Sequence, residues 1–467
     1  MLTEQQIKVI TEEVLKEMGA AKAAGYSGEL WLCQSADEAV SKAKAAQERY
    51  AEMSLDARCK IISAMRAAAV ANAESLARIA LEETGYGRLE HKIAKHHLAA
   101  EKTPGVEDLK TVAQTGDNGL MLTEPAPFGV ICSVTPSTNP TSTVINNSIS
   151  MLAAGNAIVF CPHPAAKRAS QAAIRVMYEA AVTAGAPEHI ITTLREPGIE
   201  SSGKVMSHPD VAMLSVTGGE GVVHTAMRIG KKAVCAGPGN PPVIVDETAD
   251  IEKAARAIVD GASFDNNILC IAEKEVFAVS AIAERLVQEM LKCGSVLLSP
   301  DDAEKVRKTV LSPAENGKYV INRKYVGKNA AVILRDAGVA VSGDPKLAVA
   351  MVPMGHPFVM TEMMMPVLGI VAVRDIDEAI AFAYKAENGC RHSAMIHSTN
   401  VHNMSAAARK LNTTIFVKNA PSYSGVGFGG EGYTTMTIAT PTGEGITSAK
   451  TFTRSRRCVL YGDFRIV

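Results

Sequence analysis

Short apolar runs alternate with helix-like segments along most of the chain. A largely helical stretch from 35 to about 100 comes first, and helical spacing of apolar positions returns at 140–154 and 166–184. The apolar runs predict strands at 128–134, 157–160, 190–194, 211–216 and 233–235, and then at 243–245, 275–279, 367–373, 393–397 and 414–417. Strands that alternate with helices form parallel sheets covered by helices. The pattern therefore predicts an α/β protein with two doubly wound domains.

The beginning of the chain has a separate pattern. Residues 3–18 place apolar side chains at helical spacing with charged residues between them, which predicts a short amphipathic helix. Small residues from 19 to 28 predict a linker. Two interpretations are open: the helix docks on its own domain, or the linker presents it to a partner.

Composition and charge narrow the possible functions. Lys and Arg number 48 against 49 Asp and Glu, and aromatic residues make up 4% of the chain. Neither a basic surface for nucleic acid or an anionic membrane nor a base-stacking platform is expected. The uncharged stretch 125–166 is interrupted by prolines and asparagines, so it predicts a buried interior and not a membrane span. The charged N-terminus shows no signal peptide, which predicts a soluble, cytoplasmic protein.

Nine cysteines are scattered along the chain, and none of them forms a CxxC pair. This spacing predicts a reducing compartment, with neither a disulfide framework nor a metal site. Cys132, Cys161 and Cys235 lie within or beside strand-like runs, which is typical of inert, buried thiols.

Cys270 differs from these cysteines because a polar loop precedes it. The segment FDNNILC puts Asp265, Asn266 and Asn267 just before the thiol, where they could hydrogen-bond a thiolate. Cys270 is therefore a candidate nucleophile, although an inert thiol is the open alternative. Asn139, in the uncharged loop 135–140, is a candidate to stabilise an oxyanion, but it could equally be a structural amide.

Two glycine-rich segments are candidates for binding a nucleotide. The segment 216–221 ends a predicted strand and precedes a helix-like segment, so its backbone N–H groups could hold a pyrophosphate. A plain strand-to-helix turn is the alternative. The segment 425–430 matches GxGxxG literally, but β-prone residues follow it where a helix is required, so we interpret it as a false positive.

Ordered matches over nearly the whole chain resemble one family. They include TPSTNPT (135–141), AAGNAIVFCPHPAAK (153–167), VTGG (216–219), FDNNILCIAEK (264–274), TEMMMPVLGIV (361–371) and TPTGEGITSAKTFTRSRRCVL (440–460). The sequence resembles the aldehyde dehydrogenase superfamily, specifically its CoA-acylating branch of propionaldehyde and acetaldehyde dehydrogenases from bacterial microcompartments. The resemblance implies two doubly wound parallel-sheet domains plus an oligomerisation β-hairpin.

The resemblance also implies boundaries for these parts. The expected segments are a helix at 1–18 that could serve as an encapsulation peptide, a linker at 19–28, an NAD-binding domain at 29–236, a catalytic cysteine domain at 237–420, and a return to the NAD domain at 421–467. The hairpin is expected at about 111–125 and a C-terminal oligomerisation strand within 449–467. A homodimer or homotetramer is implied.

Particular residues acquire roles from the resemblance. Cys270 matches the catalytic thiol, and Asn139 matches the amide that holds the oxyanion together with the Cys270 N–H. Glu362 matches the carboxylate that binds the nicotinamide ribose. The remaining cofactor-binding positions are Thr135, Pro136, Pro162, His163, Thr217, Gly218 and Gly219. NAD is the implied cofactor, with NADP as an alternative because Cys161 stands where hydrolytic members have a lysine.

The main departure from hydrolytic relatives is a missing carboxylate. Those enzymes activate water with a glutamate in a Glu-Leu-Gly-Gly loop, whereas the matching segment here, 235–239, is Cys-Ala-Gly-Pro-Gly. Without that base, a thiol such as coenzyme A must release the acyl group.

The resemblance predicts CoA-dependent oxidation of a short-chain aldehyde to acyl-CoA with reduction of NAD, through a cysteine thiohemiacetal and an acyl-cysteine thioester. Propionaldehyde is favoured over acetaldehyde and butyraldehyde, and the site is expected to stabilise the Cys270 thiolate. The rivals are a hydrolytic aldehyde dehydrogenase that yields free acid and a non-catalytic scaffold with the same fold. Relatives also favour a location inside a microcompartment, with residues 1–18 docked on shell proteins.

Overall fold

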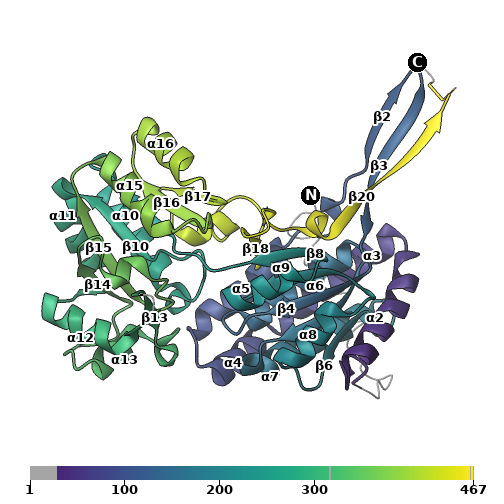
Figure 1. Cartoon of the computed structure of the whole chain (residues 1–467), viewed down its shortest axis with the longest axis horizontal. Helices are drawn as coiled ribbons and strands as arrows, with labels where there is room; N and C mark the ends of the chain where they lie inside the picture. Colours follow the sequence, from purple (N-terminus) through teal and green to yellow (C-terminus); the bar gives the residue numbers. More distant parts are fainter. Residues whose placement is uncertain (1–28, 315–316, 463, 466–467) are drawn as a thin grey trace. The chain divides into compact units, whose positions relative to one another are not determined.

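The computed structural model describes residues 29–314, 317–462 and 464–465 (Figure 1). The helix predicted at 1–18 and the linker predicted at 19–28 lie outside these residues. The chain divides into two compact units. Among the described residues, unit 1 comprises 29–83, 93–236, 433–462 and 464–465, and unit 2 comprises 84–92, 237–314 and 317–432.

Unit 1 is built on a six-stranded parallel sheet in the order β1-β6-β5-β4-β7-β8. Its strands are β1 (Leu32–Cys33), β4 (Val130–Thr135), β5 (Ala157–Pro162), β6 (Ile191–Leu194), β7 (Val211–Thr217) and β8 (Lys232–Ala236). Every residue of β4 and β5 is buried, as expected for strands with helices on both faces. After β4 the chain adds strands on one side of it and later crosses to β7 on the other, which creates a switch point between β4 and β7.

The helices of unit 1 are α2 (Ala36–Ala51), α3 (Leu55–Ala71), α4 (Ala73–Thr84), α6 (Pro140–Ala153), α7 (Lys167–Thr183), α8 (Ile199–Ser207), α9 (Glu220–Arg228) and the part of α5 (Leu89–Lys102) from residue 93 onward. Helix α6 is buried along its whole length, which explains why no charged residue occurs there. Its polar side chains bond inside the unit: Asn146 donates to Thr103 at 2.8 Å, and Asn147 donates to Ser133 at 3.0 Å.

Unit 2 contains a seven-stranded parallel sheet in the order β11-β14-β15-β10-β9-β16-β17. The strands are β9 (Pro242–Val245), β10 (Glu275–Val279), β11 (Ser295–Leu297), β14 (Leu347–Met351), β15 (Val367–Val373), β16 (Ser393–His397) and β17 (Ile415–Lys418). The helices are α10 (Ile251–Ser263), α11 (Ser280–Lys292), α12 (Pro300–Val310), α13 (Ala330–Asp336), α14 (Pro357–Met360), α15 (Ile376–Glu387) and α16 (Val401–Leu411). The predicted α/β class with two doubly wound parallel sheets is confirmed.

A three-stranded antiparallel sheet extends from the body of unit 1 (Figure 1). It consists of β2 (Val112–Gly116), β3 (Gly119–Pro127) and β20 (Thr453–Tyr461), with β3 in the middle. These elements occupy the ranges in which the hairpin and the C-terminal strand were expected. Strand β20 is mostly exposed, and its end carries Val459, Leu460 and Tyr461 on the surface.

The observed division differs from the predicted boundaries at two places. Residues 421–432 belong to unit 2, because the backbone N–H and hydroxyl of Ser422 both donate to the buried Glu273 carboxylate, at 2.8 and 2.7 Å. Residues 84–92 also belong to unit 2, because the Arg88 N–H donates to Asp265 at 2.8 Å. Both contacts join residues that are far apart in sequence.

Replacing Gly119 should loosen the three-stranded sheet. Its φ is +116°, and a Cβ there would lie 2.0 Å from the Leu460 carbonyl oxygen of β20. We expect Gly119→Ala to cost about 1–3 kcal/mol locally and to accelerate tryptic cleavage at the arginines of β20. Gly116→Ala is the matched control, since a Cβ at Gly116 meets nothing within 4 Å. Equal cleavage rates in the two variants would contradict this account.

Candidate active site

The backbone just before Cys270 is in a left-handed conformation. Asp265, Asn266 and Asn267 have φ values of 48°, 53° and 65°, and all three are buried. The left-handed region costs roughly 1–2 kcal/mol per residue for most side chains, and Asn and Asp tolerate it best. Such a turn persists only when its surroundings hold it.

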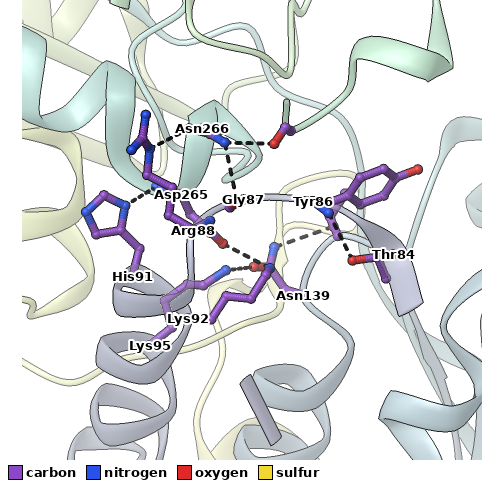
Figure 2. Close-up of polar contacts among 12 residues, drawn as sticks. Thr84, Tyr86, Gly87, Arg88, His91, Lys92, Lys95, Asn139, Asp265 and Asn266 are labelled. Atoms are coloured by element: carbon purple, nitrogen blue, oxygen red, sulfur yellow. Dashed lines mark hydrogen bonds and ion pairs between the residues drawn. The ribbon is translucent and has the colours of Figure 1, made fainter. Parts of the chain in front are cut away.

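Asp265 is held by the segment 84–92 (Figure 2). Its N–H donates to His91 Nδ1 at 2.8 Å, and its Oδ1 accepts the Arg88 N–H at 2.8 Å. Its Oδ2 forms a buried ion pair with Lys92 at 3.4 Å. A Cβ at Gly87 would lie 1.9 Å from Asp265 Oδ1, so this approach requires a glycine. The carboxylate therefore ties the turn to the beginning of α5.

The two asparagines are held by further hydrogen bonds within unit 2. Asn266 accepts from Arg88 Nε at 3.0 Å, as Figure 2 shows, and donates to the Gly327 carbonyl at 2.9 Å and to Asn329 Oδ1 at 2.7 Å. Asn267 donates to the carbonyls of Ala262 at 2.8 Å and Glu273 at 2.9 Å. The side chains of the turn thus fix the path of the chain toward Cys270.

The Cys270 thiol lies at the end of this turn, with the backbone N–H groups of Cys270 and Ile271 directed to it. Burial raises the pKa of the thiol to about 12; the Glu362 carboxylate adds to this effect, and Lys274 opposes it. The expectation that the site stabilises the thiolate is therefore wrong for this structure, because desolvation outweighs the N–H groups and the ammonium.

Glu362 lies close enough to Cys270 to raise the pKa of its thiol. Its carboxylate accepts the Gly239 N–H, and burial raises the pKa of the Glu362 carboxyl. The structure therefore brings together two predicted residues, Cys270 and Glu362, in unit 2.

The loop that lacks the hydrolytic glutamate packs against Cys270. A Cβ added to Gly239 would lie 3.1 Å from the Cys270 carbonyl oxygen and 2.8 Å from His392 Cγ. Backbone and an imidazole already fill this space, so a side chain at Gly239 does not fit. Around the thiol, the loop supplies peptide groups and no carboxylate.

His392 was missed by the sequence reasoning. Its Nδ1 bonds to Ser393 Oγ at 2.8 Å, and its buried Nε2 has no hydrogen-bond partner among the described residues. Burial, with a smaller contribution from the Lys274 charge, lowers the pKa of His392 to about 4, so the imidazole is neutral at pH 7. Only its position before β16 was visible in the sequence, because its neighbour Gly239 is distant in the chain.

Asn139 lies in unit 1, at the N-cap position of α6, where Pro140 follows it. An N-cap asparagine usually accepts a backbone N–H, but the side chain of Asn139 makes no such bond. Instead, its Oδ1 accepts a hydrogen bond from the buried Lys95 ammonium (Figure 2). An ammonium can only donate, so the oxygen must face Lys95 and the NH2 group is directed elsewhere. The Asn139 NH2 group donates a long hydrogen bond to Thr138 Oγ1, at 3.4 Å.

The predicted cofactor residues of unit 1 lie at the carboxyl ends of β4, β5 and β7, whereas Glu362 lies in unit 2. Thr135 pairs in register with Pro162, and Thr217 ends β7 across the switch point. Pro136 and His163 follow β4 and β5 directly, and the His163 side chain accepts the Ala165 N–H. Parallel sheets bind nucleotides at this edge.

Gly218 and Gly219 lead into α9, and the start of this helix fits a pyrophosphate. Gly219 is its N-cap and provides no side-chain cap, so the first N–H groups lack the usual partner. A Cβ at Gly219 or Gly221 would meet nothing within 4 Å. The buried Thr135 hydroxyl has no hydrogen-bond partner within the described chain. These residues suit a dinucleotide cofactor.

Comparison with known proteins identifies the family. The model described as "Aldehyde dehydrogenase family" matches residues 33–449. The chain belongs to the aldehyde dehydrogenase family. A propanal dehydrogenase (CoA-propanoylating) of Salmonella typhimurium is 51% identical over 436 residues, which are 93% of each chain. The acetylating acetaldehyde dehydrogenase EutE of the same organism is 47% identical over 469 residues, covering 100% of both chains.

Solved structures of aldehyde dehydrogenases are similar to this chain over more than nine-tenths of its length. A propionaldehyde dehydrogenase from the Clostridium phytofermentans fucose utilisation bacterial microcompartment matches with a TM-score of 0.91 at 48% identity, covering 94% of this chain and 100% of the other. The Rhodopseudomonas palustris propionaldehyde dehydrogenase, solved with bound CoA and an acylated cysteine, matches with a TM-score of 0.90 at 46% identity, covering 93% and 99%. The predicted resemblance to the acylating branch is confirmed.

The cysteines predicted to be inert and the GxGxxG match of this aldehyde dehydrogenase contribute no residue to the candidate active site. Cys132, Cys161 and Cys235 are buried, and Cys132 Sγ lies 3.7 Å from Cys161 Sγ. The literal GxGxxG at 425–430 lies in unit 2, and no helix follows it before the unit ends at 432. Within 29–314, 317–462 and 464–465, no cluster of metal-ligating side chains occurs. No helix in the same ranges is long and apolar enough to cross a bilayer.

The raised pKa of Cys270 predicts slow alkylation at neutral pH. Thiolate is the minor species up to high pH, so the iodoacetamide rate should climb about tenfold per unit from about pH 7 to about pH 9. Peptide mass spectrometry locates the adduct, and Cys270→Ala identifies its signal. A plateau below about pH 8 would show that the thiol ionises more easily than its surroundings imply.

Proposed function

We propose that this chain oxidises a short-chain aldehyde to acyl-CoA with reduction of NAD. The observation that carries the proposal is the packing of the Gly239 loop against Cys270, with no carboxylate to activate water. An acyl group on the thiol would then persist until a better nucleophile arrives. The relatives named as CoA-propanoylating and acetylating enzymes support the same chemistry.

Cys270 forms the first bond. Its sulfur adds to the aldehyde carbonyl, the thiol proton leaves, and the carbonyl oxygen becomes an oxyanion. The Cys270 N–H and the Asn139 amide are the donors that we assign to this oxyanion. The Lys95 contact supports Asn139 because it leaves the NH2 group of the amide as the available donor.

A bound nicotinamide supplies the hydride acceptor for the oxidation. Thr217, Gly218 and Gly219 would hold the pyrophosphate at the start of α9, and Glu362 would hold the nicotinamide ribose. Thr135, Pro136, Pro162 and His163 would line the same edge. A similar structure, an engineered glycolyl-CoA reductase at 46% identity with a TM-score of 0.90, has NADP+ bound, so NADP is the alternative to NAD.

The acyl-cysteine is released by the CoA thiol. This sulfur attacks the thioester carbonyl, its proton departs, and the bond to Cys270 breaks. His392 is our candidate to accept that proton, because its Nε2 is neutral and has no partner within the described chain, and its ring lies beside Gly239.

The experiment that tests this function follows NADH and products with and without CoA. We expect NADH formation to depend on CoA and the product to be acyl-CoA, with the highest kcat/KM for propionaldehyde among C2 to C4 aldehydes. Strong turnover to free acid without CoA would favour the hydrolytic rival. Absence of both cofactor binding and turnover would favour the scaffold.

Two substitutions test the assigned residues. Cys270→Ala should abolish acylating turnover, because no covalent intermediate can form. Asn139→Ala should lower kcat by about 10²–10³ through the loss of one oxyanion donor. Thermal unfolding of both variants checks that they fold. Acylating turnover by Cys270→Ala, or unchanged kcat in Asn139→Ala, would reject the corresponding role.

We also propose that the β2–β3–β20 sheet forms the interface of a homodimer or homotetramer. Val459 and Tyr461 are 63% and 83% exposed at the end of β20, which is unusual for such side chains in a monomer. The Gly119→Ala variant should then also lose its oligomeric state by light scattering, whereas Gly116→Ala should keep it.

Residues 1–18 are proposed to dock the enzyme on shell proteins of a bacterial microcompartment. The sequence pattern of this segment and the microcompartment origin of a similar structure support the proposal. Deleting residues 1–18 should leave kcat unchanged and abolish co-purification with shell proteins. Unchanged co-purification would contradict the proposal.

A further inference from the structure

Lys274 is a buried cation bound to neutral groups. Its side chain is fully buried in unit 2. The ammonium donates to the Asn267 carbonyl at 2.9 Å, to Asn267 Oδ1 at 2.6 Å and to the Leu269 carbonyl at 3.3 Å, and it lies 3.8 Å from Met364 Sδ. A buried charge is destabilising unless hydrogen bonds or an opposite charge compensate for its lost hydration. Burial accordingly lowers the pKa of Lys274, and Glu362 and Cys270 oppose this effect.

The groups that accept hydrogen bonds from Lys274 belong to Asn267 and Leu269, which immediately precede Cys270. Asn267 ends the left-handed turn, and the Leu269 carbonyl belongs to the peptide group whose N–H is that of Cys270. That N–H is directed to the thiol. An ammonium bound to the carbonyl draws electron density from the peptide, which makes its N–H a stronger donor.

Lys274 is the cation that acts on the thiol among the titratable groups described around it. Glu362 follows α14, Glu273 precedes Lys274, and Glu275 begins β10. Burial raises the pKa of all three carboxyls, and it lowers that of His392 on the segment before β16. Neither oxygen of the buried Glu275 has a hydrogen-bond partner in the described chain, as expected for an uncharged carboxyl. At the thiol, the Glu362 carboxylate raises the pKa of Cys270 and the Lys274 ammonium opposes it. Removing the Lys274 charge would therefore leave Glu362 unopposed.

We propose that Lys274 is a positioning residue for Cys270: its ammonium fixes the carbonyls of Asn267 and Leu269 and polarises the Leu269–Cys270 peptide toward the developing negative charge. The inference rests on the proposed role of Cys270 as the nucleophile. If Lys274 acted only by donating hydrogen bonds to these carbonyls, a neutral donor at position 274 would serve as well. The positive charge of the ammonium is therefore the feature that we expect to matter.

The test compares two alkylating reagents on Cys270 in the full-length protein. Iodoacetate is an anion and iodoacetamide is neutral, so the ratio of their rates reports the electrostatic potential at the sulfur. Lys274→Gln keeps a hydrogen-bond donor but removes the charge, and it should lower this ratio about tenfold. Lys274→Arg keeps the charge and should retain the ratio within about twofold.

Arg88→Met is the control that weakens the 265–267 turn without changing Lys274. It removes the bond to Asn266 from the opposite side, so it should change both alkylation rates by the same factor and leave their ratio unaltered. An unchanged ratio in Lys274→Gln, or an equal fall in Arg88→Met, would overturn the proposal.

Failure of the proposed function has a separate signature. The unsubstituted protein would then release free acid without CoA, or show no turnover at all, whatever the Lys274 variants do. If instead Cys270→Ala is inactive and the ratio is unchanged in Lys274→Gln, only the role of Lys274 is rejected. The acyl-enzyme burst of Lys274→Gln, measured by stopped-flow NADH absorbance, should also slow about tenfold while its thermal unfolding shows a folded protein.

Discussion

The left-handed turn at 265–267 is the constraint on which the nucleophile depends. Three consecutive residues with positive φ would not persist in an isolated loop, and each is held here by side-chain hydrogen bonds within unit 2. Asp265 bonds to Arg88 and to the ring of His91, while Asn267 bonds to the carbonyls on either side of the turn. These contacts set where Cys270 emerges and which peptide groups face its sulfur. The chemistry follows from this fixed backbone more than from an ionised thiol, because burial keeps the thiol protonated in this structure.

The second constraint is the close packing of the Gly239 backbone beside the nucleophile. Gly239 packs against the Cys270 carbonyl and the His392 ring, and the segment 235–239 that matches the glutamate loop of hydrolytic enzymes contains no carboxylate. An acyl group on Cys270 is shielded from activated water but remains open to a strong nucleophile, which is the requirement for transfer to CoA.

Much of the fold was predictable because apolar runs and helical spacing report burial directly. The strands from β4 to β8 and from β9 to β17 that the pattern predicted all exist in the structure. The residues around Cys270 were harder to predict. The tolerance of Asn and Asp for positive φ hints at the turn, but its partners at 84–92 are distant in sequence. Lys274 and His392 carry no local signal, since their importance comes from tertiary contacts with the Leu269 carbonyl and with Gly239. The assignment of 421–432 to unit 2 reflects buried tertiary contacts such as the two hydrogen bonds from Ser422 to Glu273, which carry no local sequence signal.

The central claim is that Cys270 holds an acyl group that water does not remove and CoA does. Mass spectrometry of the protein mixed with propionaldehyde and NAD, without CoA, measures this directly. The account predicts a propionyl adduct on the Cys270 peptide that persists until CoA is added and then disappears as propionyl-CoA forms. Continuous release of propionate without CoA, with no adduct on Cys270, would contradict it.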